Sequence, residues 1–234
     1  TTPGRVLNII RTAPFSPRGL LYIQDMDGMS RADSWGRAVT DTVEQIIAVD
    51  AHETDVLDPR TDAPAGKEPV TMAPVDLGPI HVPTPVVLSP MAGVTNWPFR
   101  VLCEEYGPDG LYVAEMITAR ALVARNPKAL RLCRFAPSER IRSLQLYGVN
   151  PAIVEQAARI VVDEDMADHV DLNFGCPVPK VTRRGGGSAL PWKTDLFREI
   201  IQRVVKVCSA ANIPVTAKIR VGIDHSHETF MEAG

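Results

Sequence analysis

After residue 85 the chain shows a pattern of apolar and polar positions that indicates alternating strands and helices. Short apolar or β-branched runs are followed by longer amphipathic stretches, which is typical of strand–helix units repeated around a parallel sheet. We predict strands at Val86–Ser89, Leu111–Glu115, Arg142–Leu146, His169–Asn173 and Pro214–Ile219. We predict helices at Trp97–Tyr106, Ala119–Asn126, Pro151–Asp165, Thr194–Ala210 and Glu228–Ala233.

Residues 1–80 lack this alternation. Their apolar pieces are short and separated by Pro, Gly and Asp, and residues 58–69 read as a linker. The segment Asp41–Val49 is compatible with a short helix, but an isolated helix of that length is marginal in water. We therefore expect a poorly structured extension over residues 1–80 and a barrel-forming part over residues 81–234.

The number of strand–helix units can be compared with that of a closed barrel. A complete parallel (β/α)8 TIM barrel needs about 250 residues, or roughly 31 for each unit. The stretch from Val86 to Gly234 supplies just under five such units. The sequence therefore predicts an α/β fold that contains the first five or so units of the barrel, with about three strands missing from it.

Composition excludes several classes of protein. The hydrophobic content of 45% is ordinary for one sizeable core. Neither a run of about 18 apolar residues nor a secretory signal pattern is present, so we expect a cytoplasmic protein without membrane contact. Cys103, Cys133, Cys176 and Cys208 lie far apart without a CxxC pair, which argues against a metal site and a disulfide framework.

The formal net charge of −3 means that any nucleic-acid surface has to be local. One candidate surface is Lys180, Arg183 and Arg184. A second is the stretch 120–142, which contains Arg120, Arg125, Lys128, Arg131, Arg134, Arg140 and Arg142. For this second stretch, solvated basic side chains and an RNA surface are equally open interpretations. The neighbouring run Gly185–Gly187 is adaptable backbone, but it lacks the Gly-Lys-Ser/Thr ending of a phosphate loop.

Unusual polar residues follow each predicted strand. In a parallel barrel the reactive groups lie at the carboxyl ends of the strands. The five strand ends carry Ser89-Pro90-Met91-Ala92-Gly93-Val94-Thr95-Asn96, Glu115-Met116, Gln145-Leu146-Tyr147-Gly148, Asn173-Phe174-Gly175-Cys176-Pro177 and Lys218-Ile219-Arg220. Together they predict a reactive site on the rim of the barrel.

These segments, in this order, resemble the tRNA-dihydrouridine synthase family over residues 85–234. The signature around the family's active cysteine is matched by residues 170–177, followed by Lys180, Val181, Gly187 and Ser188. The resemblance implies the amino-terminal part of an FMN-binding TIM barrel. It also implies that the enzyme, reduced by NADPH or NADH, saturates the C5–C6 bond of uridine in tRNA, and that it is a monomer when complete.

The resemblance assigns Cys176 as the proton donor. In the family, hydride from flavin N5 adds to C6 of the uracil, so C5 needs a general acid on the opposite side. A thiol is mostly protonated at neutral pH and still gives up its proton readily, which suits this role.

The resemblance also assigns cofactor and substrate contacts. Lys218 matches the lysine beside the flavin pyrimidine edge, where a positive charge stabilises reduced flavin. Gln145 offers a donor and an acceptor to the flavin ring, and Asn173 is placed for the imide edge of the uracil. Arg220 points to the same side as Lys218, because side chains alternate along a strand, and it contacts substrate or flavin.

The remaining contacts come from the first two strand ends. Pro90, Met91 and Ala92 match the stretch that underlies the flavin ring. Glu115 matches a family position at the base of the site and is left outside the catalytic set.

Two other functions are kept open. One is another FMN barrel with a loop cysteine, such as a dihydroorotate dehydrogenase, which turns over a free pyrimidine. The other is a truncated non-catalytic remnant or an RNA-binding fragment. Substrate choice distinguishes the first from a tRNA enzyme, and flavin absorbance distinguishes the second.

Overall fold

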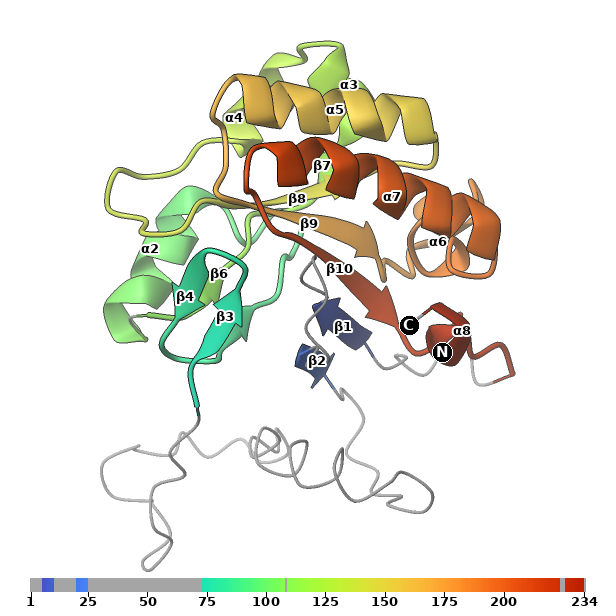
Figure 1. Ribbon diagram of the computed structural model, residues 1–234, viewed down its shortest axis with the longest axis horizontal. Coiled ribbons are helices and arrows are strands. Elements are labelled where there is room, and N and C mark those ends of the chain that lie inside the picture. The colour runs from blue at the N-terminus through green and yellow to red at the C-terminus, as the bar shows by residue number, and fades with distance from the viewer. Residues whose placement is uncertain (1–5, 11–19, 25–72, 108, 224–225, 234) are drawn as a thin grey trace, which may run out of the picture.

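The computed structural model describes residues 6–10, 20–24, 73–107, 109–223 and 226–233. Its largest sheet has six strands in the order β2-β1-β10-β9-β8-β7 (Figure 1). Four of these strands are parallel neighbours: β7 (Ile117–Thr118), β8 (Ser143–Tyr147), β9 (His169–Phe174) and β10 (Val215–Arg220). The prediction of an α/β fold built on parallel strands is confirmed.

The first two predicted strands form a short parallel pair of their own. This pair is β5 (Val87–Leu88) with β6 (Leu111–Tyr112). A parallel bridge from Val113 to Ser143 connects the chain after β6 to β8. The parallel strands thus follow one another in chain order, which is the winding of the barrel predicted from sequence.

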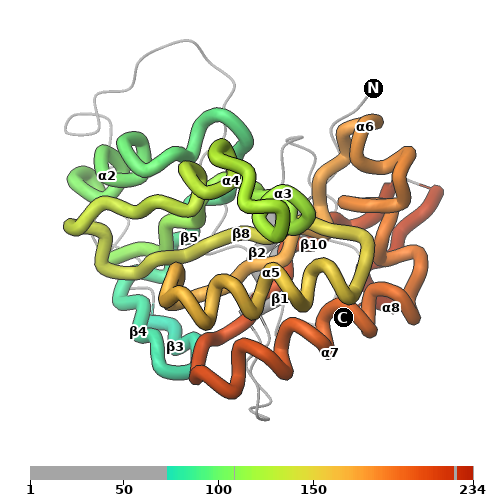
Figure 2. The backbone as a smooth tube through the Cα atoms, turned by 90° about the horizontal axis from the view of Figure 1, so that it is seen from above, coloured from blue at the N-terminus to red at the C-terminus, as the bar shows by residue number. Residues whose placement is uncertain are grey.

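Helices cover the outer side of this curved sheet (Figure 2). In chain order the helices of the described residues are α2 (Trp97–Tyr106), α3 (Ala119–Val123), α4 (Pro127–Leu132), α5 (Pro151–Asp163), α6 (Pro179–Thr182), α7 (Thr194–Ala210) and α8 (Phe230–Ala233), with a 3₁₀ turn η1 (Gly187–Ala189) before α7. Of these, α6 and α8 lie beyond the carboxyl ends of β9 and β10 and not on the outer side of the sheet (Figure 1). The predicted bounds of α2 and α7 are confirmed, and β7, α4, α6 and η1 were not predicted.

Three of the helices begin at the same kind of signal. The side chains of Asn96, Asn126 and Asn150 accept a backbone N–H of the first turn of α2, α4 and α5, and a proline occupies one of the first two helical positions each time. An asparagine cap satisfies an otherwise unpaired N–H, and proline is tolerated there because its missing N–H is not needed.

The apolar core lies between the sheet and the helices α5 and α7. Val170, Leu172 and Phe174 of β9 are buried against residues of both helices, including Val154 and Ile200. Successive side chains of a strand point to opposite faces. The intervening residues of β9 therefore project to the inner face of the sheet, as do the matching residues of β8 and β10.

Two antiparallel hairpins lie within or beside the predicted extension. β1 (Val6–Ile10) pairs with β2 (Leu20–Gln24) and with β10, whereas β3 (Val75–Leu77) pairs with β4 (Ile80–Val82). The strands β1 and β2 were not predicted. The predicted helix Asp41–Val49 and linker 58–69 lie outside the described residues, and the domain division at residue 80 stays a prediction.

A buried ion pair fastens α2 to the loop before β8. The guanidinium of Arg100 donates to both carboxylate oxygens of Glu139, with its Nε 2.6 Å from Oε2. It also donates to the carbonyls of Thr95 and Arg134 and lies over the Phe135 ring. Both charges are buried and fully hydrogen-bonded. The pair therefore holds α2 against the loop before β8, and the bond to the Thr95 carbonyl holds the end of the loop after β5 at the same place.

Within the described ranges, none of the helices has the length and apolar character needed to cross a bilayer.

We predict that buried His169 makes the fold sensitive to acid. Burial lowers the pKa of His169 to about 4 from its ordinary value of 6.5, and its Nδ1 lies 2.7 Å from Ser143 Oγ. Between these two pH values only the unfolded chain takes up the proton, so each unit of acidification costs about 1.4 kcal/mol of unfolding free energy.

Urea unfolding of the parent and of His169→Asn between pH 7 and pH 4 measures this effect. The variant has no titrating group at this position, so its unfolding free energy should fall less steeply with acidification than that of the parent. Parallel curves would show that His169 does not contribute.

Candidate active site

The inner faces of β8, β9 and β10 carry polar side chains arranged in layers. Strand register places Gln145 beside Asp171 and Asp171 beside Thr216 in one layer, and Asn173 beside Lys218 in the next layer towards the carboxyl ends. All five residues are buried. A barrel interior normally holds layers of apolar side chains, so a polar layer of this kind indicates a site.

Asp171 is the centre of this arrangement. Its carboxylate accepts hydrogen bonds from Gln145 Nε2, at 2.6 Å, and from the hydroxyl of Thr216. Burial raises the pKa of Asp171, while the bonds from Thr216 and Gln145 and the charge of Lys218 act in the opposite direction. The carboxylate therefore fixes which end of the Gln145 amide faces it.

The same chain of bonds continues to the turn that holds Cys176. Asn173 Nδ2 donates to Gln145 Oε1 at 2.9 Å. Asn173 Oδ1 accepts the backbone N–H groups of Gly175, at 3.3 Å, and of Cys176, at 3.1 Å. Asp171 thus orients the Gln145 amide, Gln145 orients the Asn173 amide, and Asn173 holds the backbone N–H of Cys176.

The opposite side of the turn is held by a tightly packed glycine loop. Ser188 N–H donates to the Cys176 carbonyl at 3.0 Å. Gly187 has φ +55°, and a Cβ there would lie 2.2 Å from that same carbonyl oxygen. At Gly186 a Cβ would lie 2.4 Å from Tyr147 Oη. Gly187 therefore excludes any side chain, and a side chain at Gly186 would have to displace Tyr147 and Val149, so this part of the glycine run serves close packing.

Two cations lie next to the turn. Lys218 is 9% exposed, and burial lowers its pKa to about 8, with the charges of Asp171 and Cys176 raising it and that of Arg220 lowering it further. Arg220 Nε donates to the Gly175 carbonyl at 3.1 Å, and burial lowers its pKa as well. In the described part of the chain no hydrogen bond to the Lys218 ammonium is present, so this cation fits an anionic ligand.

The loop after β5, with Pro90, Met91 and Ala92, is braced separately. Met91 N–H donates to Thr95 Oγ1 at 3.0 Å, and Thr95 Oγ1 donates back to the Met91 carbonyl. Glu115 Oε2 accepts the Gly93 N–H at 2.7 Å. Glu115 therefore holds the shape of this loop.

The structure brings the other predicted site residues together. Cys176, Gln145, Asn173, Lys218 and Arg220 all lie on β8, β9, β10 and the turn after β9. Within the described residues, no hydrogen bond joins Pro90, Met91 or Ala92 to this group.

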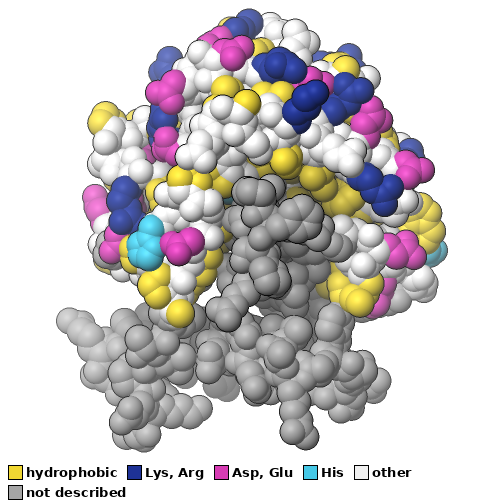
Figure 3. All heavy atoms as spheres, viewed as in Figure 1, with side chains coloured by type: hydrophobic (Ala, Val, Ile, Leu, Met, Phe, Trp, Pro, Cys, Tyr) yellow, Lys and Arg dark blue, Asp and Glu magenta, His cyan; other side chains and the backbone are white. Residues whose placement is uncertain are grey.

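The two basic stretches differ in their surroundings. In the stretch 120–142, Arg125 pairs with Glu164, Arg140 with Asp109, and Arg142 with Asp165 and Asp168. Figure 3 shows that Lys and Arg alternate with Asp and Glu over the upper part of this face. By contrast, none of the ion pairs in the described part of the chain involves Lys180, Arg183 or Arg184.

Sequence reasoning missed three residues that shape the site. Asp171 and Thr216 are joined by a hydrogen bond in the polar layer. Tyr147 lies against Gly186, and the pKa of its hydroxyl is raised mainly by burial and to a smaller extent by the nearby Cys176. The available signal was the two-residue period of a strand: Asp171 shares a face with Asn173, and Thr216 shares a face with Lys218.

Comparison with known proteins gives the family. The family model described as "Dihydrouridine synthase (Dus)" matches residues 87–234. A probable tRNA-dihydrouridine synthase of Mycobacterium tuberculosis (strain H37Rv) is 51% identical over 164 residues, which cover 68% of this chain and 42% of the relative. The tRNA-dihydrouridine synthase B of Shewanella oneidensis is 37% identical over 158 residues, which cover 68% of this chain and 48% of the relative.

The chain therefore spans less than half the length of these relatives. The matched region contains every layer of polar side chains described above, and its parallel α/β architecture agrees with the TIM barrel of the family. On these grounds the chain belongs to the dihydrouridine synthase family.

Proposed function

We propose that this chain carries the active site of a flavin-dependent oxidoreductase that reduces the C5–C6 bond of uridine in tRNA, with NADPH or NADH as the reductant. The proposal is supported by family membership and by the names of the relatives. The single observation that carries it is the Cys176 turn, which is fixed by Asn173 and lies beside the buried cations Lys218 and Arg220.

The polar layer fits FMN. Lys218 is a buried cation without a hydrogen-bond partner among the described residues, which suits the negative charge that reduced flavin carries around N1 and O2. Gln145 uses one amide hydrogen on Asp171 and retains a second for a flavin ring atom. Pro90, Met91 and Ala92 would underlie the ring. When bound, FMN supplies the hydride that adds to C6 of the uracil.

Cys176 would complete the reduction by moving a proton. Its thiol gives a proton to C5, so hydride and proton together saturate the C5–C6 bond and leave a thiolate. Lys218 is buried on the neighbouring strand, and Arg220 donates to the carbonyl of Gly175, the residue before Cys176. These cations therefore stabilise the thiolate as it forms, which lowers the barrier to proton donation.

Asn173 would orient the uracil. Its Nδ2 donates one hydrogen to Gln145 and retains another, and its Oδ1 already accepts two backbone N–H groups. The remaining amide hydrogen suits a carbonyl oxygen of the imide edge. Because Asn173 also holds the backbone of Cys176, this one side chain would position both the uracil base and the thiol that donates the proton.

The proposed function is tested by incubating the complete enzyme with unmodified tRNA and NADPH and measuring dihydrouridine. Dihydrouridine formation supports the proposal. Turnover of dihydroorotate without reduction of tRNA would identify a different FMN enzyme, and purified protein without flavin absorbance would indicate a non-catalytic RNA-binding chain.

We predict that Cys176→Ala in the complete enzyme retains flavin but reduces uridine about 10²–10⁴-fold more slowly, since general acid catalysis contributes that much. Dihydrouridine formed per minute in tRNA is the measurement. Cys103→Ala is the matched control, because Cys103 is also a partly exposed free cysteine and lies on α2. An undiminished rate in Cys176→Ala would exclude the proposed proton donor.

We predict that Lys218→Met weakens FMN binding and slows reduction of the flavin by the nicotinamide, because reduced flavin loses a nearby positive charge in a site shielded from water. Flavin titration and stopped-flow absorbance measure the two effects. Lys206→Met on the exposed side of α7 removes the same charge away from the site. Identical flavin affinity and reduction rate in Lys218→Met and Lys206→Met would contradict the assignment.

We predict that Asp171→Asn destabilises the fold by about 1–3 kcal/mol, the usual cost of an unsatisfied buried polar group. The amide of Asn can keep its oxygen on Gln145 only if its NH₂ faces Thr216, whose buried hydroxyl then accepts and leaves its own hydrogen without the partner it had; turning Gln145 over instead would set its NH₂ against that of Asn173. The Cys176 turn should loosen, which faster alkylation of Cys176 by iodoacetamide would report.

Thr216→Val is the control for this prediction, because it removes one bond to Asp171 and leaves the bond between Asp171 and Gln145. Alkylation of Cys176 in Thr216→Val should stay near the parent rate. Equal alkylation rates in the parent and in Asp171→Asn would show that the polar layer does not hold the turn.

A further inference from the structure

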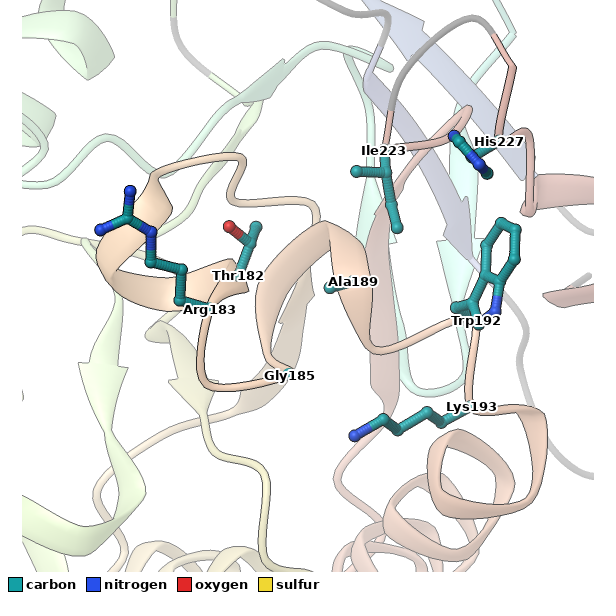
Figure 4. Close-up of a pocket in the computed structure, with 8 residues that line it drawn as sticks. All are labelled: Thr182, Arg183, Gly185, Ala189, Trp192, Lys193, Ile223 and His227. Atoms are coloured by element: carbon teal, nitrogen blue, oxygen red, sulfur yellow. The ribbon is translucent and has the colours of Figure 1, made fainter.

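A hollow of about 540 Å³ lies beside the Cys176 turn, and its walls include Arg183, Trp192, Lys193, Ile223 and His227 (Figure 4). We refer to it as the Trp192 hollow. Its volume is within the range of about 300–1,000 Å³ that is usual for ligand pockets. The residues come from two loops, one after β9 and one after β10.

Both loops also build the active site. The loop after β9 contains the turn at Cys176, and Ser188 within it donates to the Cys176 carbonyl. The loop after β10 starts from Arg220, which donates to Gly175, and Ile223 N–H donates to the His227 carbonyl at 3.0 Å. The Trp192 hollow and the site at Cys176 are therefore built from the same two loops.

Trp192 offers a flat apolar surface at this place. The side chain is 54% exposed. Its ring lies 5.1 Å from the His227 ring, centroid to centroid, with 60° between the planes, and Ile223 lies alongside (Figure 4). An indole exposed in a hollow is a stacking surface for a nucleobase, because every base has a π face.

Two cations accompany this surface. Lys193 and Arg183 are both exposed, and Lys193 Nζ lies 3.0 Å from where a Cβ on Gly185 would stand, so the ammonium is directed across the hollow towards that turn. No ion pair in the described part of the chain uses either side chain. Lys193 follows Trp192 in the chain and suits the phosphate next to a stacked base, whereas Arg183 lies at the other end of the hollow with its guanidinium directed away from Trp192 and suits a second phosphate (Figure 4).

We infer that the Trp192 hollow binds a nucleotide next to the target uridine in the tRNA, with its base stacked on Trp192 and its phosphate on Lys193, while Arg183 contacts a different phosphate further along the same strand. This inference rests on the proposed function. An apolar protein segment fits less well, because the two cations would be left without partners in its interface. A single-stranded RNA segment satisfies both the ring and the cations.

The affinity of the complete enzyme for unmodified tRNA tests the inference. Trp192→Ala should weaken binding about 5- to 150-fold, which corresponds to the loss of one base–aromatic stack. Trp192→Phe should retain most of the affinity, because a ring remains. The matched control is Tyr106→Ala, which removes an aromatic side chain of high exposure from the end of α2.

Lys193→Gln and Arg183→Gln test the phosphate contacts. Each should lower the slope of log affinity against log salt by about one, because one cation–phosphate contact is lost. Flavin content of each variant shows whether it is folded. If Trp192→Ala does not fold, quenching of tryptophan fluorescence by tRNA that is clearly smaller in Trp192→Phe than in the parent supports the inference, and equal quenching in the two overturns it, because the other tryptophans are the same in both.

The outcomes separate the inference from the proposed function. A parent that reduces uridine in tRNA while Trp192→Ala binds tRNA as tightly as the parent would overturn the inference and leave the function standing. The same holds if Trp192→Phe is as weak as Trp192→Ala, or if both salt slopes are unchanged. A parent that neither binds nor reduces tRNA contradicts the proposed function itself.

Discussion

The bonds of the Asp171 carboxylate are the constraint on which the site depends. A buried carboxylate has to be satisfied by donors, and here Gln145 and Thr216 supply them. Satisfying Asp171 sets the direction of the Gln145 amide, which sets that of Asn173 and, through Asn173, the backbone at Cys176. Each step has only one arrangement in which donors face acceptors, so a single charged group determines the geometry of a reactive turn.

The strands separate stability from chemistry by using their two faces differently. On β9 the outward residues Val170, Leu172 and Phe174 pack against the helices and stabilise the fold by burial. The inward residues His169, Asp171 and Asn173 are equally buried but polar. Because one face supplies the apolar core, the other can hold groups that destabilise the fold, such as a neutral histidine and a lysine of lowered pKa.

Much of this fold was predictable from local pattern. The bounds of α2 and α7 agree with the predicted helices, because an amphipathic period runs through each segment and, for α2, Asn96 caps its start. The two residues of β7 are too few to produce a period, and the pairing of Val6 with Arg220 joins residues that no local pattern connects. The helix α4 was missed although Asn126 and Pro127 signal its start.

For the site, sequence motifs predicted individual residues but not the hydrogen bonds between them. Cys176, Lys218 and Asn173 were predicted because motifs mark them, and motifs do not describe how side chains bond to each other. The two-residue period of the strand puts Asp171 on the face of Asn173, but it does not show that the bonds from Gln145 and Thr216 meet at Asp171. Nor could the sequence decide the basic stretch 120–142, because the carboxylate partner of Arg125 is Glu164, far along the chain. Pairing of this kind depends on the folded arrangement.

The hydrogen bonds around Cys176 also limit what kind of cysteine it can be. The N–H groups of Gly175 and Cys176 are both held by Asn173, and the carbonyls of the same residues accept from Arg220 and Ser188. The next residue is Pro177, which has no N–H. Backbone N–H groups beside a reactive cysteine are one common source of hydrogen bonds for a negative charge that develops next to the sulfur. This turn has none left to give, so any donor to such a charge has to be a side chain from a neighbouring strand and not the turn itself.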